Sequence, residues 1–430
     1  MPPADRDNPL LRLSATGPDT PAGALFRRYW LPVLLADELP EPNCAPLRVT
    51  LLGEALIAFR DSAGRLGLVD EYCAHRGASL WFARNEDHGL RCAYHGWKYD
   101  TSGQCTEIPS EPEHSSVRDR IRLKSYPLIE RGGILWAYLG PPQHQPAPPA
   151  FEFVQVPAAQ RYASKRLQEC NYLQALDGGM DPFHLAFLHR GEFAGVRRLA
   201  SDGVRRFMKP ELNLRMASAR SEGGLQLANG RQSEAGIFWR VMQWIMPCFT
   251  LIPPFGEHPV HGHAWVPIDD ERCWVWTFEY HPTRALAPDE LSDARAGGGL
   301  HVPVLPGSFL PAANRGNDYL MDRSKQKSGI HYSGVPGIGN QDAALQENMS
   351  PVARRVEHLV SIDQFIVQAR RRLTEAVQRV SDGDEGPLPG TTAAAQQVRS
   401  ASALLTEDVD VFEAVRPATQ MESGAAFLSV

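Results

Sequence analysis

The chain has 430 residues, enough for two or three domains that each bury a core. Hydrophobic residues make up 43% of it and charged residues 22%, an ordinary globular composition that excludes fibrous and disordered classes. The formal net charge is -6, from 44 basic and 50 acidic side chains without blocks of like charge, which argues against a nucleic-acid partner.

The N-terminal residues do not have the pattern of a targeting segment. The first twenty contain no apolar run behind basic residues, so a signal peptide is not expected. The apolar run YWLPVLLA at residues 29–36 is too short to cross a bilayer. We therefore expect a cytoplasmic protein with no membrane partner and with reduced thiols.

Strand patterns predict an all-β domain over residues 25–142. Residues 46–70 contain short β-branched and leucine-rich runs that are broken by GE and DSAGR, which are typical of hairpin turns. Residues 1–24 would form an N-terminal arm. The proline-rich residues 143–153 predict an extended linker.

Two pairs of cysteine and histidine lie in this domain. Cys73 and His75 are separated by one residue, and after sixteen further residues Cys92 and His95 are separated by two. A glycine shortly after each pair would close a tight turn around a metal centre. Two thiolates and two imidazoles suit a tetrahedral zinc ion or a Rieske [2Fe–2S] cluster, and the single residue inside the first pair favours the cluster.

A second group of reactive side chains lies at residues 169–191, ECNYLQALDGGMDPFHLAFLHRG, within text that predicts helix at about 166–190. The spacing of Asp177, Asp181 and His184 would place them on one helix face. His189 would point elsewhere on a straight helix, but two glycines and a proline would kink it so that both imidazoles converge. Two histidines and one carboxylate form the metal site of non-haem Fe(II) oxygenases.

The remaining chain predicts an α+β domain over residues 154–383. Strand-like segments at about 211–280 and helical stretches at about 341–349 and 360–381 indicate an antiparallel sheet flanked by helices, in a helix-grip-like arrangement. Residues 384–430 are rich in Gly, Pro and Ala and would form a C-terminal tail. No glycine-rich dinucleotide motif follows a strand, so NADH and flavin are expected on a separate reductase.

These motifs together identify a family resemblance. Residues from about 20 to 380 resemble the oxygenase components, or alpha subunits, of Rieske non-haem iron aromatic-ring-hydroxylating oxygenases, and they are most similar to the phthalate dioxygenase branch. The resemblance lies in CAHRGASL, CAYHGWKYD, ECNYLQALDGGMDPFHLAFLH and NQDAALQENMSPV. It implies a Rieske [2Fe–2S] cluster on Cys73, His75, Cys92 and His95, and a mononuclear Fe(II) on His184 and His189.

The resemblance also implies a third iron ligand. Asp342, in GNQDAALQ, matches the position of the family's iron carboxylate at the start of a late helix. Asp363 and Glu347 are the alternatives.

Asp181 is expected to act as an electron-transfer bridge and not as a ligand. In this family the corresponding aspartate hydrogen-bonds an iron-bound histidine of its own subunit, here His184, and a cluster histidine of the neighbouring subunit, here His95. Such an arrangement implies a homotrimer or a hexamer of stacked trimers.

The cluster is expected to have a low potential. Rieske proteins of respiratory complexes carry an extra cysteine in each loop and a serine that donates to a cluster sulfur, whereas this chain has Ala78, Tyr94 and Trp97 at those positions. Hydrogen bonds to the sulfurs raise the potential, so we expect a midpoint near the bottom of the roughly -150 to +300 mV range.

Arginines are the candidate substrate-binding residues. Alternation in IFWRVMQWIM places Arg240 in an apolar row, where a guanidinium needs an anion. That anion is an internal acid or a substrate carboxylate. The phthalate enzymes use arginines for the carboxylates of their substrate, and Arg240 and Arg206 are the nearest matches.

The resemblance implies a terminal oxygenase that uses O₂ and electrons from an NADH-dependent flavin/iron-sulfur reductase to convert an aromatic carboxylate, of the phthalate or benzoate type, to a cis-dihydrodiol. The alternative on the same scaffold is a Rieske monooxygenase that removes the methyl group of an aryl ether. A simple Rieske electron carrier would leave the second group of histidines and acids without a role.

Overall fold

The computed structural model describes residues 9–112, 114–190, 192, 214–254 and 257–421. The chain divides into two compact units, Thr16–Pro146 and Met1–Ala15 with Ala147–Val430. Within the described residues, every helix falls short of the length and hydrophobicity that a membrane span requires.

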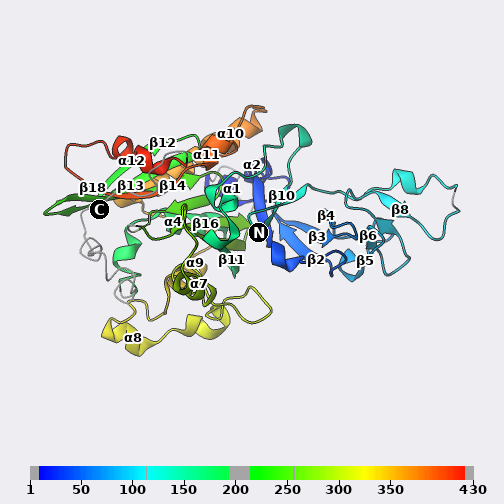
Figure 1. The fold of residues 1–430 in the computed structure, drawn as a ribbon, viewed down its shortest axis with the longest axis horizontal. Coiled ribbons are helices and arrows are strands. Elements are labelled where there is room, and N and C mark those ends of the chain that lie inside the picture. Colours follow the sequence, from blue (N-terminus) through cyan, green and yellow to red (C-terminus); the bar gives the residue numbers. More distant parts are fainter. Residues whose placement is uncertain (1–8, 113, 191, 193–213, 255–256, 422–430) are drawn as a thin grey trace. The chain divides into compact units, whose positions relative to one another are not determined.

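Three small antiparallel sheets build the unit Thr16–Pro146, whose strands are blue to cyan in Figure 1. Their strands, in spatial order, are β1 (Trp30–Leu35), β10 (Ile134–Tyr138) and β9 (Leu128–Arg131); β2 (Leu47–Leu51), β3 (Glu54–Arg60) and β4 (Leu66–Asp70); and β5 (Arg84–Glu86), β6 (Gly89–Arg91), β7 (Lys98–Tyr99) and β8 (Cys105–Glu107). Apart from α2 (Pro21–Phe26) and short 3₁₀ turns, the described unit is all-β, as predicted.

The predicted hairpin turns in residues 46–70 are present. Leu52 and Gly53 connect β2 to β3 with φ angles of 50° and 77°, the left-handed backbone that suits the twist of a two-residue hairpin. Between β3 and β4, the Asp61 carboxylate accepts hydrogen bonds from the backbone amides of Ala63 and Arg65, at 3.0 and 2.8 Å. Local turn chemistry therefore determines this meander.

An eight-stranded antiparallel sheet dominates the second unit. Its strands, in spatial order, are β11 (Arg161–Gln168), β17 (Cys273–Tyr280), β16 (Val260–Pro267), β15 (Phe249–Ile252), β14 (Gly236–Ile245), β13 (Gly224–Ser233) and β12 (Arg215–Arg220), with β18 (Ala401–Leu405) also paired to β14. β15 pairs with the last part of β14 and β18 with its first part, so a segment from the end of the chain completes the sheet.

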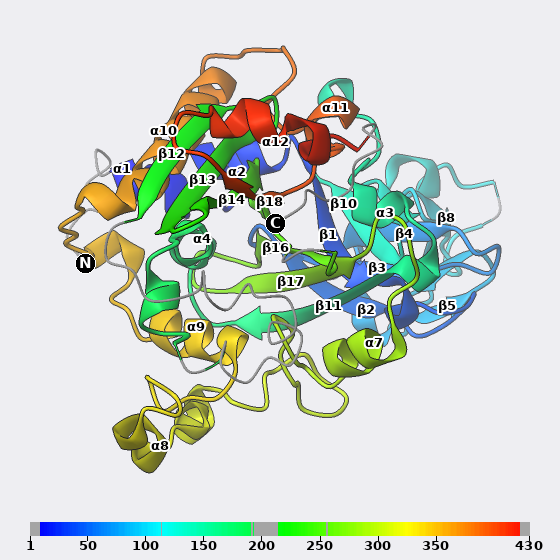
Figure 2. The ribbon, with the colours of Figure 1, turned by 60° about the vertical axis from the view of Figure 1, so that its left-hand side comes forward.

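Helices cover both faces of this sheet. α4 (Tyr172–Met180) packs on β16, and α9 (Ile338–Glu347) lies beside α4, as Figure 2 shows. α12 (Val411–Thr419) packs on the other face, against Ile237, Trp239 and Val241 of β14. The other helices among the described residues of this unit are α1 (Pro9–Ser14), α3 (Glu152–Gln155), α7 (Pro288–Arg295), α8 (Arg323–Ser328), α10 (Gln364–Ser381) and α11 (Ala393–Gln396). The predicted α+β class, with helices flanking an antiparallel sheet, is confirmed.

The helix predicted at about 166–190 is wrong in extent. Residues 161–168 form strand β11, and helix α4 begins only after Asn171, whose side chain accepts from the backbone amide of Leu173 at 2.9 Å. α4 ends at Met180, and Asp181 has extended backbone angles of -77° and 114°. The residue before a proline avoids helical angles, so Pro182 ends the helix where a kink was expected.

Candidate metal centres

The two loops with the cysteine and histidine pairs have matching backbone turns. The amide of Gly77 donates to the carbonyl of Cys73, and the amide of Gly96 donates to the carbonyl of Cys92, both at 2.9 Å. The two glycines have φ angles of 72° and 76°, which residues with a side chain rarely adopt. Glycine therefore closes both loops.

The four predicted cluster ligands combine two buried thiols with two converging imidazoles. Nδ1 of His75 lies 3.1 Å from Nδ1 of His95, and the His75 ring stacks on Trp97 with centroids 4.6 Å apart. Cys73 and Cys92 are buried. Burial raises the pKa of the Cys73 thiol, and Cys92 raises it further, so a free thiolate at Cys73 is disfavoured. A cluster that takes two thiolates and two imidazoles fits this donor set.

Tyr99 is a further candidate residue of this site, which the sequence did not indicate. Its hydroxyl lies 3.2 Å from Sγ of Cys73 and accepts from the backbone amide of Ala74 at 3.1 Å. Burial raises the pKa of Tyr99, so the hydroxyl keeps its proton and can donate it to the sulfur. Tyr99 lies in the motif HGWKYD, but its contact with Cys73 depends on the approach of two loops that are separated in sequence.

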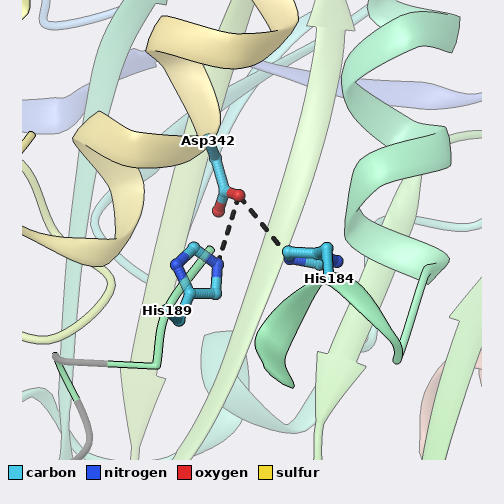
Figure 3. A group of neighbouring side chains, drawn as sticks. All are labelled: His184, His189 and Asp342. Atoms are coloured by element: carbon cyan, nitrogen blue, oxygen red, sulfur yellow. Dashed lines mark ion pairs between the residues drawn. The ribbon is translucent and has the colours of Figure 1, made fainter. Parts of the chain in front are cut away.

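His184, His189 and Asp342 meet in the second unit, and one ligand atom from each lies within 4.8 Å of the others. Figure 3 shows both imidazoles facing the Asp342 carboxylate. Oδ1 of Asp342 is 3.2 Å from Nε2 of His189 and 3.6 Å from Nε2 of His184. His184 begins a 3₁₀ turn (His184–Ala186) after α4, and Asp342 projects from α9. The end of α4 thus brings together the two histidines that a straight helix would separate.

The charges of this group suit a divalent metal. Burial alone would raise the pKa of Asp342, but His189 and His184 outweigh it and lower that pKa, so the carboxylate is anionic. Burial would lower the pKa of His184, but Asp181 and Asp342 raise it overall. The side chain of His189 is 2% exposed, while those of His184 and Asp342 are 22% and 23% exposed. The accessible side of the group therefore lies along His184 and Asp342.

The alternative carboxylates have other contacts. Oδ2 of Asp363 accepts from the backbone amide of Val360 at 2.7 Å. Glu347 accepts from the Tyr319 hydroxyl at 2.6 Å and from the Glu169 backbone amide at 3.1 Å. Both act as structural acceptors, and neither belongs to the group formed with the two histidines.

Asp181 lies on the other side of His184 from Asp342. Its Oδ2 is 3.4 Å from Nδ1 of His184, and its Oδ1 accepts from the backbone amide of Phe183 at 2.7 Å. Because Nδ1 and Nε2 are on opposite edges of the ring, one carboxylate can orient the imidazole that faces the other.

Asp177, which the helical spacing placed beside Asp181, belongs to a separate ion pair. Arg370 of α10 contacts its two carboxylate oxygens at 2.6 and 3.3 Å and also holds Glu357. Burial raises the pKa of Asp177 to about 6, against the opposing charge of Arg370. This contact anchors α4 to α10.

Arg240 is buried on the sheet face that carries α4. Alternation places Arg240 on the same side of β14 as Trp244. Trp244 pairs with Thr250 of β15, and Thr250 pairs with His263 of β16, so these side chains share one face of the sheet. The guanidinium of Arg240 donates to the carbonyl of Pro253 at 2.8 Å. Burial, together with the charge of Arg231, lowers the pKa of Arg240 to about 9, which leaves it cationic at neutral pH. Arg206 lies outside the described residues.

Comparison with known families matches both units. Residues 29–127 match the Rieske [2Fe-2S] domain, and residues 137–422 match the family described as LigXa C-terminal domain like. The first match decides between the two metal centres considered for the N-terminal loops, in favour of the cluster over zinc.

Individual relatives support the same grouping. The chain is 34% identical to the phthalate 4,5-dioxygenase oxygenase subunit of Pseudomonas putida, over 91% of this chain and 90% of the relative. It is 39% identical to the 5,5'-dehydrodivanillate O-demethylase oxygenase subunit of a Sphingobium species, over 41% of this chain and 42% of the relative. Among solved structures, dicamba monooxygenase bound to dicamba shares the fold, with a TM-score of 0.57 and 20% identity over 83% of this chain and 98% of that one.

Proposed function

The chain belongs to the family of Rieske oxygenase components, and we propose that it is the terminal oxygenase of a system that dihydroxylates an aromatic carboxylate to a cis-dihydrodiol. One observation carries the proposal. Two histidines and one carboxylate converge, with an accessible side, in a chain that also has a Rieske domain.

The cofactors are a Rieske [2Fe–2S] cluster and a mononuclear iron. We assign the cluster to residues 25–142 and the iron to residues 154–383, with residues 1–24 and 143–153 as arm and linker. Residues 384–430, predicted as a tail, supply β18 to the sheet of the second unit and α12 to one of its faces. The proposed ligands are Cys73, His75, Cys92 and His95 for the cluster, and His184, His189 and Asp342 for the iron. When bound, these groups supply single electrons and the reductive activation of O₂.

Asp181 would orient His184 and connect the two sites. Its position 3.4 Å from Nδ1 of His184 allows its carboxylate to fix this ring while Nε2 serves as a ligand. The side chain of His95 is exposed, which suits contact with the corresponding aspartate of a neighbouring subunit. This pairing requires a closed ring of subunits, and we propose a homotrimer or a hexamer of stacked trimers.

Arg240 would bind the substrate carboxylate. It is cationic and buried on the sheet face on which α4 packs, and a guanidinium can hold a carboxylate through two parallel hydrogen bonds. The similarity to a phthalate dioxygenase subunit supports an aromatic acid as substrate. Arg206 stays a candidate for the same role.

The protein works with a separate reductase, as oxygenase components of Rieske systems do. We propose that this reductase carries the NADH and flavin chemistry, because the chain has no glycine-rich dinucleotide motif after a strand. The cytoplasmic location stays a prediction.

The test is whether an aromatic acid accelerates oxidation of the reduced cluster. The protein is reduced anaerobically and mixed with air and one member of a panel of aromatic acids, and the reduced-cluster resonance signal is followed. We expect at least one acid to accelerate loss of the signal in the wild type but not in Asp342→Ala. Equal loss with every acid and in both proteins would overturn the proposal.

An O-demethylase is the second candidate, favoured by the similarity to the dehydrodivanillate enzyme subunit. It would use the same ligands but hold a methoxy carbon at the iron in place of the ring. Aryl methyl ethers of the acids, added to the same panel, distinguish the two. Release of formaldehyde identifies the demethylase.

A further inference from the structure

Gln341 connects the proposed iron ligand His189 to a buried polar network. Its side chain is fully buried, and its Oε1 lies 2.7 Å from Nδ1 of His189. Its Nε2 lies 3.0 Å from Oε1 of Glu192 and 2.8 Å from the carbonyl oxygen of Val335. Each hydrogen of the Nε2 group thus has its own acceptor, and Oε1 faces Nδ1 of His189.

These partners fix the orientation of the amide. A carboxylate oxygen and a backbone carbonyl can only accept hydrogen bonds, so both must face the NH₂ group of Gln341. The opposite orientation would place the amide oxygen against two other acceptors, and at most one of the two amide hydrogens would find a partner, on Nδ1 of His189. Oε1 must therefore face His189, and Nδ1 of His189 must carry a hydrogen to donate to it.

We propose that Gln341 is a positioning residue that fixes the tautomer of His189 with the hydrogen on Nδ1, so that the lone pair on Nε2 is available to the metal. Nε2 faces Oδ1 of Asp342 at 3.2 Å. A neutral imidazole in this tautomer presents a lone pair to a carboxylate, and only a cation or an added proton between them makes this contact favourable. The inference rests on the metal site of the proposed function.

The network continues beyond Gln341. Oε1 of Glu192 also contacts Nδ1 of His331 at 2.6 Å, and both side chains are largely buried. An anionic acceptor strengthens the hydrogen bond that holds the Gln341 amide. Glu192 therefore stabilises the orientation of the Gln341 amide, whose oxygen faces the proposed iron ligand His189.

The two histidines would thus be oriented by different chemistry. Nδ1 of His184 faces the Asp181 carboxylate at 3.4 Å, whereas Nδ1 of His189 faces a neutral amide at 2.7 Å. A neutral partner orients His189 without adding another negative charge beside Asp342. Groups that orient metal ligands in this way typically contribute a factor of about 10–100 to metal affinity.

The test measures Fe(II) affinity and does not depend on turnover. Protein with its cluster intact is depleted of mononuclear iron with a chelator, then titrated anaerobically with Fe(II) against a chromophoric competitor. We expect Gln341→Met, which keeps the side-chain length but has no amide, to bind Fe(II) about 10–100-fold more weakly than the wild type. Gln243→Met is the matched control, because Gln243 is equally buried and loses one amide hydrogen bond, to the carbonyl of Arg399, far from the triad in sequence.

An exchange of the two side chains separates orientation from packing. In Gln341→Glu combined with Glu192→Gln, the new carboxylate can accept from Nδ1 of His189 and the new amide can donate to it, but the carbonyl of Val335 loses its donor. We expect this double variant to recover part of the Fe(II) affinity that Gln341→Met loses. Wild-type Fe(II) affinity in Gln341→Met would overturn the inference and leave the proposed function standing. A wild type that binds no Fe(II) beyond its cluster would overturn the proposed function itself.

Discussion

Oδ2 of Asp181 lies 3.4 Å from Nδ1 of His184, on the edge of the ring opposite the nitrogen that faces Asp342. Pro182 produces this arrangement, because it ends α4 and leaves Asp181 in extended backbone just before the 3₁₀ turn of His184. One short segment therefore supplies both a proposed ligand and the carboxylate that orients it.

Replacing Asp181 with alanine should separate metal binding from turnover. We expect Asp181→Ala, supplied with excess Fe(II), to retain the cluster and the mononuclear iron, because all proposed ligands are still present. Turnover should fall about 100-fold or more, since the imidazole loses its orienting carboxylate and the proposed link between subunits is broken. Metal analysis together with product formation per O₂ consumed checks both parts. Coupled turnover at the wild-type rate would exclude Asp181 as the bridge.

Replacing Asp342 with alanine should remove only the mononuclear iron. Its carboxylate is the anionic member of the triad, and two imidazoles alone form a weaker site. We expect the iron content to fall from about three to about two atoms per chain, while the cluster spectrum is unchanged. Asp363→Ala is the matched control, because that carboxylate accepts from the backbone at the start of α10. Loss of the mononuclear iron from Asp363→Ala, and not from Asp342→Ala, would show that Asp363 is the iron ligand.

Replacing Tyr99 with phenylalanine should lower the cluster potential. The variant removes the hydroxyl that lies 3.2 Å from Sγ of Cys73 and keeps the ring. A hydrogen bond of about 1 kcal/mol to the reduced cluster corresponds to about 40 mV in a one-electron couple. A redox titration followed by circular dichroism measures the shift.

The wild-type midpoint potential should itself lie near the bottom of the Rieske range, and a strongly positive value would contradict that prediction.

Replacing Arg240 with methionine should weaken recognition of the acid. A charge-assisted pair of about 2 kcal/mol corresponds to a fall of about 30-fold in kcat/KM for the aromatic acid. The primary amide of the same acid should be affected much less, because it lacks the negative charge. If kcat/KM falls equally for acid and amide, Arg240 supports the fold through its contact with Pro253 and does not bind the carboxylate.

Local patterns were sufficient to predict the N-terminal unit. Gly53, Gly77 and Gly96 all have the positive φ angles that their turns require, and these turns can be recognised from neighbouring residues alone. The second unit was harder to predict from local patterns. Residues 161–168 contain more helix formers than strand formers, and only their pairing with β17 makes them a strand.

Contacts between distant segments explain what the sequence could not predict. The set of His184, His189 and Asp342 was proposed from motifs, and the structure brings the three side chains together, while their metal binding stays a prediction. Tyr99 and Gln341 were missed because each contacts a loop or helix far away in sequence, and hydrogen bonds of this kind leave no spacing pattern.

The most direct test of the central claim is a single turnover with ¹⁸O₂. Protein reduced anaerobically is mixed with ¹⁸O₂ and an aromatic acid that accelerates cluster reoxidation, and the product is analysed by mass. We predict a product that gains two hydrogens and two ¹⁸O atoms from one O₂ molecule, which is the mass of a dihydrodiol. Recovery of the acid unchanged while the cluster is reoxidised, or a hydroxylated ring without ¹⁸O, would contradict the assignment of this chain as the oxygenase.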